Sequence, residues 1–224
     1  MDLHLFSTAG PGFDIAWVLA ASREVLGDKH EASVAFLPQA SLNAARLLKE
    51  TERAFRDLAQ IVPIDTETMQ LPDIEAILRR AALVYIPGGN AFLLNHRLHT
   101  SGLMPHLRKM IQNGLPVVAV SAGTVACGPN ILTSNDLNMV PTPHFNGLAL
   151  TPFNFNVHYD DNVGRNEWLS DYRIFHDDPV IMLTDGAYVR VKGKTAMLVQ
   201  GEAWCWRAGH DKERLTPGEP IKPN

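Results

Sequence analysis

The sequence has 224 residues, of which 46% are hydrophobic and 20% are charged, and its formal net charge is −4. This length and composition predict one sizeable hydrophobic core. The chain has no basic block interleaved with aromatic residues, which argues against nucleic-acid binding. It also lacks an apolar run of membrane-spanning length and the features of a signal peptide. We therefore expect a cytoplasmic protein that binds neither nucleic acid nor a membrane, and a homodimer is an open alternative to a monomer.

The sequence shows no motif for a metal or a nucleotide. Its two cysteines, Cys127 and Cys205, are too few for a disulfide framework or a thiolate metal site. The histidines lack metal-ligand spacing, and neither a Walker sequence nor Gly-x-Gly-x-x-Gly is present. We expect no cofactor and no metal.

The N-terminal half alternates short apolar runs with segments of helical periodicity. Asp14 is expected to cap the first helix. Strands that alternate with helices predict an α/β fold with a mostly parallel sheet flanked by helices. The predicted strands span residues 3–6, 34–37, 61–64, 83–86 and 117–120, and the helices include 41–58, 72–81 and 103–112.

The second half has a different character. Residues 128–155 are rich in Pro, Asn and Thr, and they predict a long functional loop. Short antiparallel strands follow at 180–183, 187–191, 196–199 and 203–206, with turns at Asp185-Gly186 and Lys192-Gly193. We expect a single domain over residues 1–209 and a loose C-terminal tail over 210–224.

Ser121 follows the buried strand 117–120 and precedes the small residues Ala122 and Gly123. This order is typical of a nucleophile elbow, in which a tight strand-to-helix turn exposes a serine. Ala119 occupies the position of the first glycine in the strict Gly-x-Ser-x-Gly pattern. The pattern alone favours an ordinary turn whose serine caps the helix.

A glycine-rich segment, Gly88-Gly89-Asn90, ends the preceding strand in the sequence. Carboxyl ends of parallel strands are where ligands bind in such sheets, so this segment is expected close to Ser121. Its free N–H groups, with that of Ala122, could hold a developing oxyanion. The alternative is a tight turn in which glycine tolerates positive φ.

A serine nucleophile needs a base and a group that orients the base. His158 follows the alternating run 153–157 and is one candidate base, and His144 lies in the same region. Asp136 is the most suggestive acid between the serine and His158. The alternatives are a half-buried structural histidine and a turn aspartate that binds its own backbone.

Together these motifs resemble the dipeptidase E (α-aspartyl dipeptidase) family of serine peptidases, to which cyanophycinase is related. The similarity runs from residue 3 to about residue 209, with four motifs in matching order. These motifs are 86–92 (IPGGNAF), 121–127 (SAGTVAC), 133–136 (TSND) and 156–159 (NVHY).

The resemblance implies a flavodoxin-like α/β fold related to the class I glutamine amidotransferase domains. It also implies that Ser121 is the nucleophile, His158 the general base and Asp136 the residue that orients it. Gly89 and Ala122 would form the oxyanion hole, with Asn90 nearby.

The resemblance further implies a small peptide substrate, with N-terminal Asp-Xaa dipeptides first. Family members hold the aspartate through an arginine after the catalytic histidine, and Arg165 and Arg173 are the candidates here. The family's Gly-Glu-Thr-Arg motif is absent from this segment. Asp160 and Asp161 add negative charge near the expected substrate pocket. The alternatives are a peptidase or isopeptidase of other specificity and a non-catalytic binding module.

Overall fold

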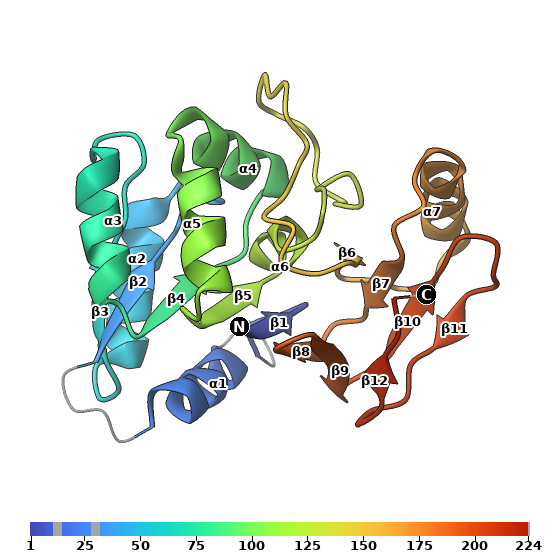
Figure 1. Ribbon diagram of the computed structural model, residues 1–224, viewed down its shortest axis with the longest axis horizontal. Coiled ribbons are helices and arrows are strands. Elements are labelled where there is room, and N and C mark those ends of the chain that lie inside the picture. Colours follow the sequence, from blue (N-terminus) through green and yellow to red (C-terminus); the bar gives the residue numbers. More distant parts are fainter. Residues whose placement is uncertain (11–14, 28–31, 224) are drawn as a thin grey trace.

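The computed structural model describes residues 1–10, 15–27 and 32–223, which form an α/β protein with two β-sheets (Figure 1). The larger sheet has the strand order β12-β9-β8-β1-β5-β4-β2-β3, and the smaller has β11-β10-β7-β6. The strands are β1 (Asp2–Phe6), β2 (Ser33–Phe36), β3 (Gln60–Pro63), β4 (Leu83–Ile86), β5 (Val117–Val120), β6 (Asn154–Asn156), β7 (Val180–Leu183), β8 (Tyr188–Lys192), β9 (Thr195–Gln200), β10 (Ala203–Trp206), β11 (Glu213–Arg214) and β12 (Pro220–Ile221).

The helices alternate with the first strands, as the sequence predicts. They are α1 (Ala16–Leu26), α2 (Ala44–Phe55), α3 (Leu71–Arg80), α4 (Ala91–Thr100), α5 (Leu103–Gln112), α6 (Ala122–Ala126) and α7 (Val163–Phe175). The strands β1 to β5 pair in parallel, which confirms the predicted sheet. The expected helix cap, Asp14, lies outside the described residues.

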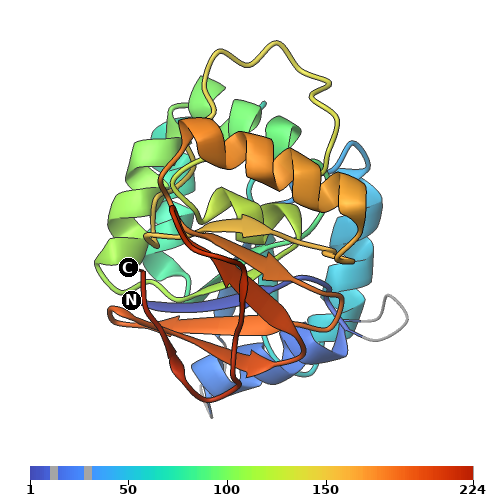
Figure 2. The same ribbon diagram turned by 90° about the vertical axis from the view of Figure 1, so that its right-hand side faces the viewer.

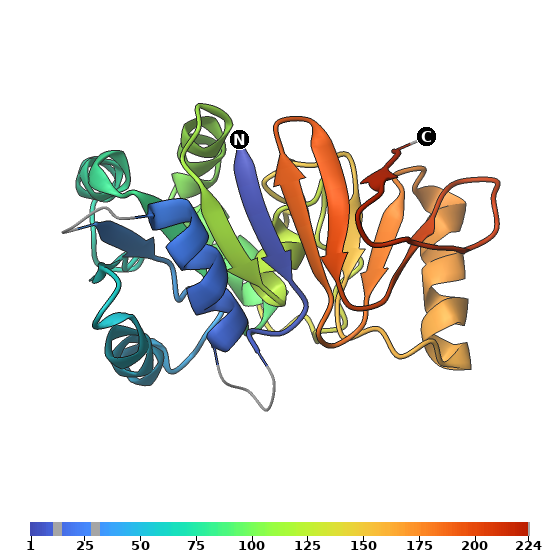
Figure 3. The ribbon, with the colours of Figure 1, turned by 90° about the horizontal axis from the view of Figure 1, so that it is seen from below.

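Each face of the larger sheet is covered by its own helices. In β5, Val118 and Val120 join the cluster under α1 and α2, whereas Val117 and Ala119 join the cluster under α3, α4 and α5. All four side chains are at most 5% exposed, so β5 is buried on both faces. Figure 3 shows α1 on its face of the sheet and α7 beside the smaller sheet.

The C-terminal strands divide between the two sheets, so the second half is not a simple antiparallel series (Figure 2). The turn at Lys192-Gly193 joins the antiparallel pair β8 and β9, as expected. The turn at Asp185-Gly186 closes no hairpin, because β7 pairs with β10 and β6 while β8 pairs with β1 and β9. This turn therefore carries the chain from the smaller sheet to the larger one.

The segment after residue 209 is paired rather than loose. In it, β11 pairs with β10, and β12 pairs with β9 at the edge of the larger sheet. Ile221 is only 7% exposed and belongs to the main hydrophobic cluster. Its burial gives the end of the chain a fixed place, since covering such a side chain contributes about 1.5–3 kcal/mol.

Candidate active site

Ser121 lies at the carboxyl end of β5 in a left-handed backbone conformation, with φ 50°. A non-glycine residue rarely adopts this region, and its cost is of the order of 1–3 kcal/mol. The conformation is held because the Ser121 N–H donates to Phe6 O at 2.9 Å and Ser121 O accepts from Val125 N at 3.0 Å. Ser121 is therefore a strained elbow between β5 and α6.

Close packing explains the glycine at position 123 of the elbow. A Cβ at Gly123 would lie 2.4 Å from Ile86 O, so only glycine fits there. Ala119 stands where the strict pattern has glycine, and its methyl group is fully buried in the main cluster. The elbow thus forms without the first glycine.

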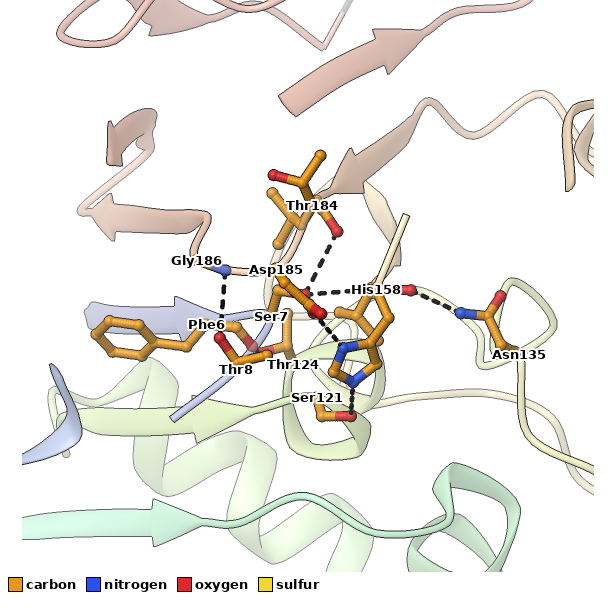
Figure 4. A network of polar contacts seen from close by, with 12 residues as sticks. Phe6, Ser7, Thr8, Ser121, Thr124, Asn135, His158, Thr184, Asp185 and Gly186 are labelled. Carbon is orange, nitrogen blue, oxygen red and sulfur yellow. Dashed lines mark hydrogen bonds and ion pairs between the residues drawn. The ribbon is translucent and has the colours of Figure 1, made fainter. Parts of the chain in front are cut away.

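His158 is brought to Ser121 from the smaller sheet. It follows β6, has φ 53°, and its Nε2 lies 2.9 Å from Ser121 Oγ. On the other side of the ring, Nδ1 lies 2.6 Å from Asp185 Oδ1 (Figure 4). With its proton on Nδ1 facing the carboxylate, the imidazole can accept the serine proton at Nε2.

The acid that contacts His158 is Asp185, not the predicted Asp136. Because β6 and β7 are parallel, the residues after each strand meet at the same end, where the Tyr159 N–H donates to Leu183 O at 2.9 Å. Asp185 follows β7 and reaches the imidazole from there. From the sequence, Asp185-Gly186 is predicted only as a turn. Knowledge that β6 and β7 pair in parallel would have identified Asp185 as the acid next to His158.

Asp136 has a structural environment instead. Its Oδ2 accepts from the Ala91 N–H at 2.7 Å and from Ser134 Oγ at 3.0 Å. It thereby binds a free N–H in the first turn of α4, where a carboxylate is favourable. The same segment supports β6, because Asn135 Nδ2 donates to Val157 O at 2.6 Å and Thr133 Oγ1 donates to Phe155 O at 2.8 Å.

The glycine-rich segment lies beside Ser121, as expected. A Cβ at Gly88 would lie 3.2 Å from Ser121 Cβ, and one at Gly89 (φ 144°) would lie 2.3 Å from Ala40 O. Within the described residues, the N–H groups of Gly89 and Ala122 have no assigned acceptor. They are thus available to an oxyanion, although this role stays a prediction.

Asn90 is already committed to other contacts. Its N–H donates to Ala40 O at 2.8 Å. Its side chain accepts from Leu93 N at 2.9 Å as the N-cap of α4 and donates to Leu137 O at 2.9 Å. Asn90 therefore fixes the loop between β4 and α4.

The two candidate arginines lie away from the Ser121 cleft. Arg165 donates to Asn156 Oδ1 at 3.1 Å and lines a separate hollow of about 470 Å³ with Asp136 and Trp168. Arg173 donates to Arg207 O and stacks 4.6 Å from the centroid of Trp206, and burial lowers its pKa. Neither side chain is among those that line the cleft.

The cleft beside Ser121 has a volume of about 860 Å³. Its walls are largely apolar, and its described lining contains the acids Glu50 and Asp185 but no lysine or arginine. Arg46 pairs with Glu50 at 2.8 Å on the exposed face of α2. The apolar wall includes Ile15, Trp17, Leu47, Ala54, Tyr85 and Val120.

The loop that follows His158 is held by the C-terminal segment. Lys212 donates to Tyr159 Oη at 2.8 Å and pairs with Asp161, which has φ 54°. Hydrogen bonds from Lys212, Asn166 and Tyr159 hold the pKa of the Asp161 carboxyl well below its usual range. A segment expected to be loose therefore stabilises the histidine loop.

The cysteines are unsuited to nucleophilic attack. Burial raises the pKa of the Cys127 thiol to about 12, and burial raises that of Cys205 to about 11. Both thiols are thus protonated near neutral pH, and the thiolate is the reactive form. In the described parts of the chain, no cluster of three or more His, Cys, Asp or Glu could hold a metal ion.

The described helices also include none that is long and apolar enough to cross a membrane. The fold and the site together define a class: α/β proteins that present a serine, a histidine and an acid at the carboxyl ends of strands.

The sequence places the chain in one family of this class. The model of peptidase family S51 matches residues 15–199, and the chain belongs to that family. It is 38% identical over 156 residues to a probable alpha-aspartyl dipeptidase of Drosophila melanogaster, a match that covers 65% of each chain. It is 36% identical over 155 residues to peptidase E of Streptomyces coelicolor, which covers 65% of this chain and 64% of that protein.

Solved structures support the fold. A putative peptidase E from Listeria monocytogenes superposes with a TM-score of 0.72 at 22% identity, covering 89% of this chain and 98% of the other. A peptidase from an acI-B1 actinobacterium gives a TM-score of 0.70 at 17% identity, covering 98% and 96%. The fold is that of the class I glutamine amidotransferase-like proteins, as the sequence resemblance implies.

Proposed function

We propose that this chain is a serine dipeptidase that hydrolyses short peptides through an acyl-enzyme. The observation that carries the proposal is the continuous pair of hydrogen bonds from Ser121 to His158 and from His158 to Asp185. Family membership and the names of the fly and Streptomyces relatives support a peptidase.

The chemistry follows from these contacts. Ser121 Oγ attacks the scissile carbonyl while His158 Nε2 accepts its proton, and Asp185 stabilises the imidazolium that forms. The N–H groups of Gly89 and Ala122 hold the oxyanion. His158 then protonates the leaving amine, and water repeats the sequence on the acyl-enzyme.

The test is turnover of dipeptides by the wild type and by Ser121→Ala. Loss of the nucleophile should reduce kcat by roughly 10⁴-fold or more. Circular dichroism should show an unchanged fold, since Ser121 Oγ makes no structural contact in the described residues besides that to His158. Undiminished hydrolysis by Ser121→Ala would refute the proposal, as would a wild type that cleaves no dipeptide.

Two substrate classes are to be compared. The name of the fly relative points to Asp-Xaa dipeptides, which we propose as the first class. The apolar cleft wall, with Glu50 and Asp185 but no lysine or arginine in its described lining, favours neutral N-terminal residues as the second. A panel of Asp-Leu, Asn-Leu and Leu-Leu separates the classes, because a carboxylate clamp would favour Asp-Leu over its isosteric amide.

We further propose a cytoplasmic location. Both cysteines are free and buried, which fits a reducing compartment.

A further inference from the structure

We propose that three consecutive residues at the carboxyl end of β1, namely Phe6, Ser7 and Thr8 (the β1-end segment), position all three members of the catalytic constellation. The inference rests on the proposed function, and it assigns to this segment a role that the motifs around Ser121 and His158 do not reveal. Figure 4 shows the segment between Ser121, His158 and the turn at Asp185-Gly186.

Phe6 holds the serine elbow. Its carbonyl oxygen accepts from the Ser121 N–H at 2.9 Å and from Thr124 Oγ1 at 2.8 Å. The parallel register sets this contact, because Phe6 lies opposite Val120. One carbonyl thus fixes both the strained residue and the first turn of α6.

Ser7 holds the histidine. Its side chain is fully buried, and its Oγ accepts from the His158 N–H at 2.9 Å while it donates to Leu183 O at 3.3 Å. His158 has a positive φ, so its backbone needs such external contacts to keep one conformation. The hydroxyl connects β1 to both strands that carry the catalytic histidine and acid.

Thr8 holds the turn that carries the acid. Its Oγ1 accepts from the Gly186 N–H at 3.2 Å, directly after Asp185. The side chain of Asp185 is 71% exposed, and in the described residues its carboxylate contacts only His158. The place of this carboxylate therefore depends on how the backbone of its turn is held.

Phe6, Ser7 and Thr8 follow one another at the end of β1, and each makes one of these contacts. Ser121, His158 and Asp185 are distant in sequence. Ser121 and His158 each donate a backbone N–H to this segment, and Gly186, the residue after Asp185, does the same. A displacement of about 1 Å can lower a catalytic rate roughly 100-fold. We therefore expect loss of the Ser7 or Thr8 hydroxyl to lower kcat by roughly 10- to 100-fold, with KM changed by less than about threefold.

The experiment compares matched variants. Thr8→Val removes the acceptor at constant shape, and Thr8→Ser keeps it. Ser7→Ala is matched by Ser22→Ala, since Ser22 is equally buried and its hydroxyl has no partner in the described residues. We expect Ser22→Ala to keep the wild-type kcat and Thr8→Ser to retain most of it. In Ser7→Ala and Thr8→Val, kcat should fall by roughly 10- to 100-fold.

Two readouts separate positioning from general destabilisation. His158 Nδ1 lies 2.6 Å from Asp185 Oδ1. We expect the NMR resonance of a proton on this nitrogen to broaden or shift in Ser7→Ala and Thr8→Val, but not in Ser22→Ala. Because Thr8 acts through Asp185, adding Thr8→Val to Asp185→Ala should cause little further loss of kcat. If Ser7→Ala does not fold, the comparison of Thr8→Val with Thr8→Ser and the double variant still test whether the β1-end segment has a positioning role.

The outcomes distinguish this inference from the proposed function. If the wild type cleaves dipeptides but Ser7→Ala and Thr8→Val match the Ser22→Ala control in kcat and NMR signal, the positioning role is overturned and the dipeptidase stands. If no dipeptide is cleaved, the proposed function fails, and the His158 resonance alone decides whether the β1-end segment positions the imidazole. An equal loss in Thr8→Ser and Thr8→Val would also overturn the role of the Thr8 hydroxyl.

Discussion

The loop that carries Asp136 and the turn that carries Asp185 both contact the region around His158, yet they present their carboxylates very differently. Asp136 is half-buried and accepts hydrogen bonds from Ala91 N and Ser134 Oγ. Asp185 is 71% exposed on its side chain and contacts the imidazole. Asp136 is held by hydrogen bonds to its surroundings and has a structural role. Asp185 has no such hydrogen bonds in the described residues, so its carboxylate is available to His158.

Of the variants that test this comparison, Asp185→Ala has the largest expected effect. Without the carboxylate the imidazole loses its orientation and its counter-charge, so kcat/KM should fall by about 10²- to 10⁴-fold. The melting temperature should change little, because the side chain is exposed. The matched control is Asp177→Ala, an exposed acid in the loop before β7. Equal activity of the two variants would contradict the assignment of Asp185.

The next effect concerns the link between the Asp136 loop and β6. Asn156 is fully buried, and its Nδ2 donates to Thr133 O at 2.8 Å and to Asn135 Oδ1 at 2.7 Å. Asn156→Ala leaves buried polar groups unpaired, so the free energy of unfolding should fall by about 2–3 kcal/mol.

Denaturant titration of Asn156→Ala against Asn138→Ala, an exposed residue of the same loop, measures this loss. Equal midpoints for the two variants would show that the loop does not support β6.

A smaller effect is expected for Asp136→Ala. It removes the acceptor for the Ala91 N–H, and loss of such a helix cap costs about 0.5–2 kcal/mol. Thermal unfolding should register this loss, while kcat falls by less than about tenfold, since the imidazole keeps Asp185. A fall in kcat as deep as that of Asp185→Ala would reverse the roles given to the two acids.

The smallest expected effect is a pH dependence of the free energy of unfolding. It arises from His4 in β1, which belongs neither to the Asp136 loop nor to the Asp185 turn. His4 is fully buried in β1, where burial lowers its pKa from 6.5, and Asp2 partly opposes that shift. The unfolded chain then binds a proton more readily than the folded one, so stability falls as pH drops below about 6.5 and is constant above it. Tyr188, Arg190 and Glu24 complete its polar surroundings.

Melting temperatures between about pH 5 and pH 8 test this, and His4→Gln should flatten the acid side of the curve. An unchanged slope in His4→Gln would assign the acid sensitivity to other groups.

Much of the fold could be predicted because burial on both faces leaves a clear pattern. Strand β5 appears in the sequence as an unbroken apolar run with small residues after it, and the elbow at Ser121 follows from that order. The partner acid could not be predicted in the same way. Strand β6 has three residues, and its parallel pairing with β7, which brings Asp185 to His158, leaves no local signal in either strand.

The end of the chain illustrates the same limit. Residues 210–223 are polar and rich in turn formers, which favours a loose tail, but pairing with β9 and β10 is a long-range property. Lys212 contacts Tyr159 only because the fold places it there. Local composition describes how a segment could behave alone, and tertiary contacts decide where it lies.

The central position of β1 has a consequence for synthesis of the protein. This strand precedes both of its neighbours in the sequence. On one side it pairs with β5, and on the other with β8, whose residues follow more than 180 positions later. A nascent chain on the ribosome therefore cannot complete the sheet until its last third is exposed, and long-range pairing of this kind is slow. The strand ends that carry Ser121, His158 and Asp185 are therefore expected to come together only late in synthesis.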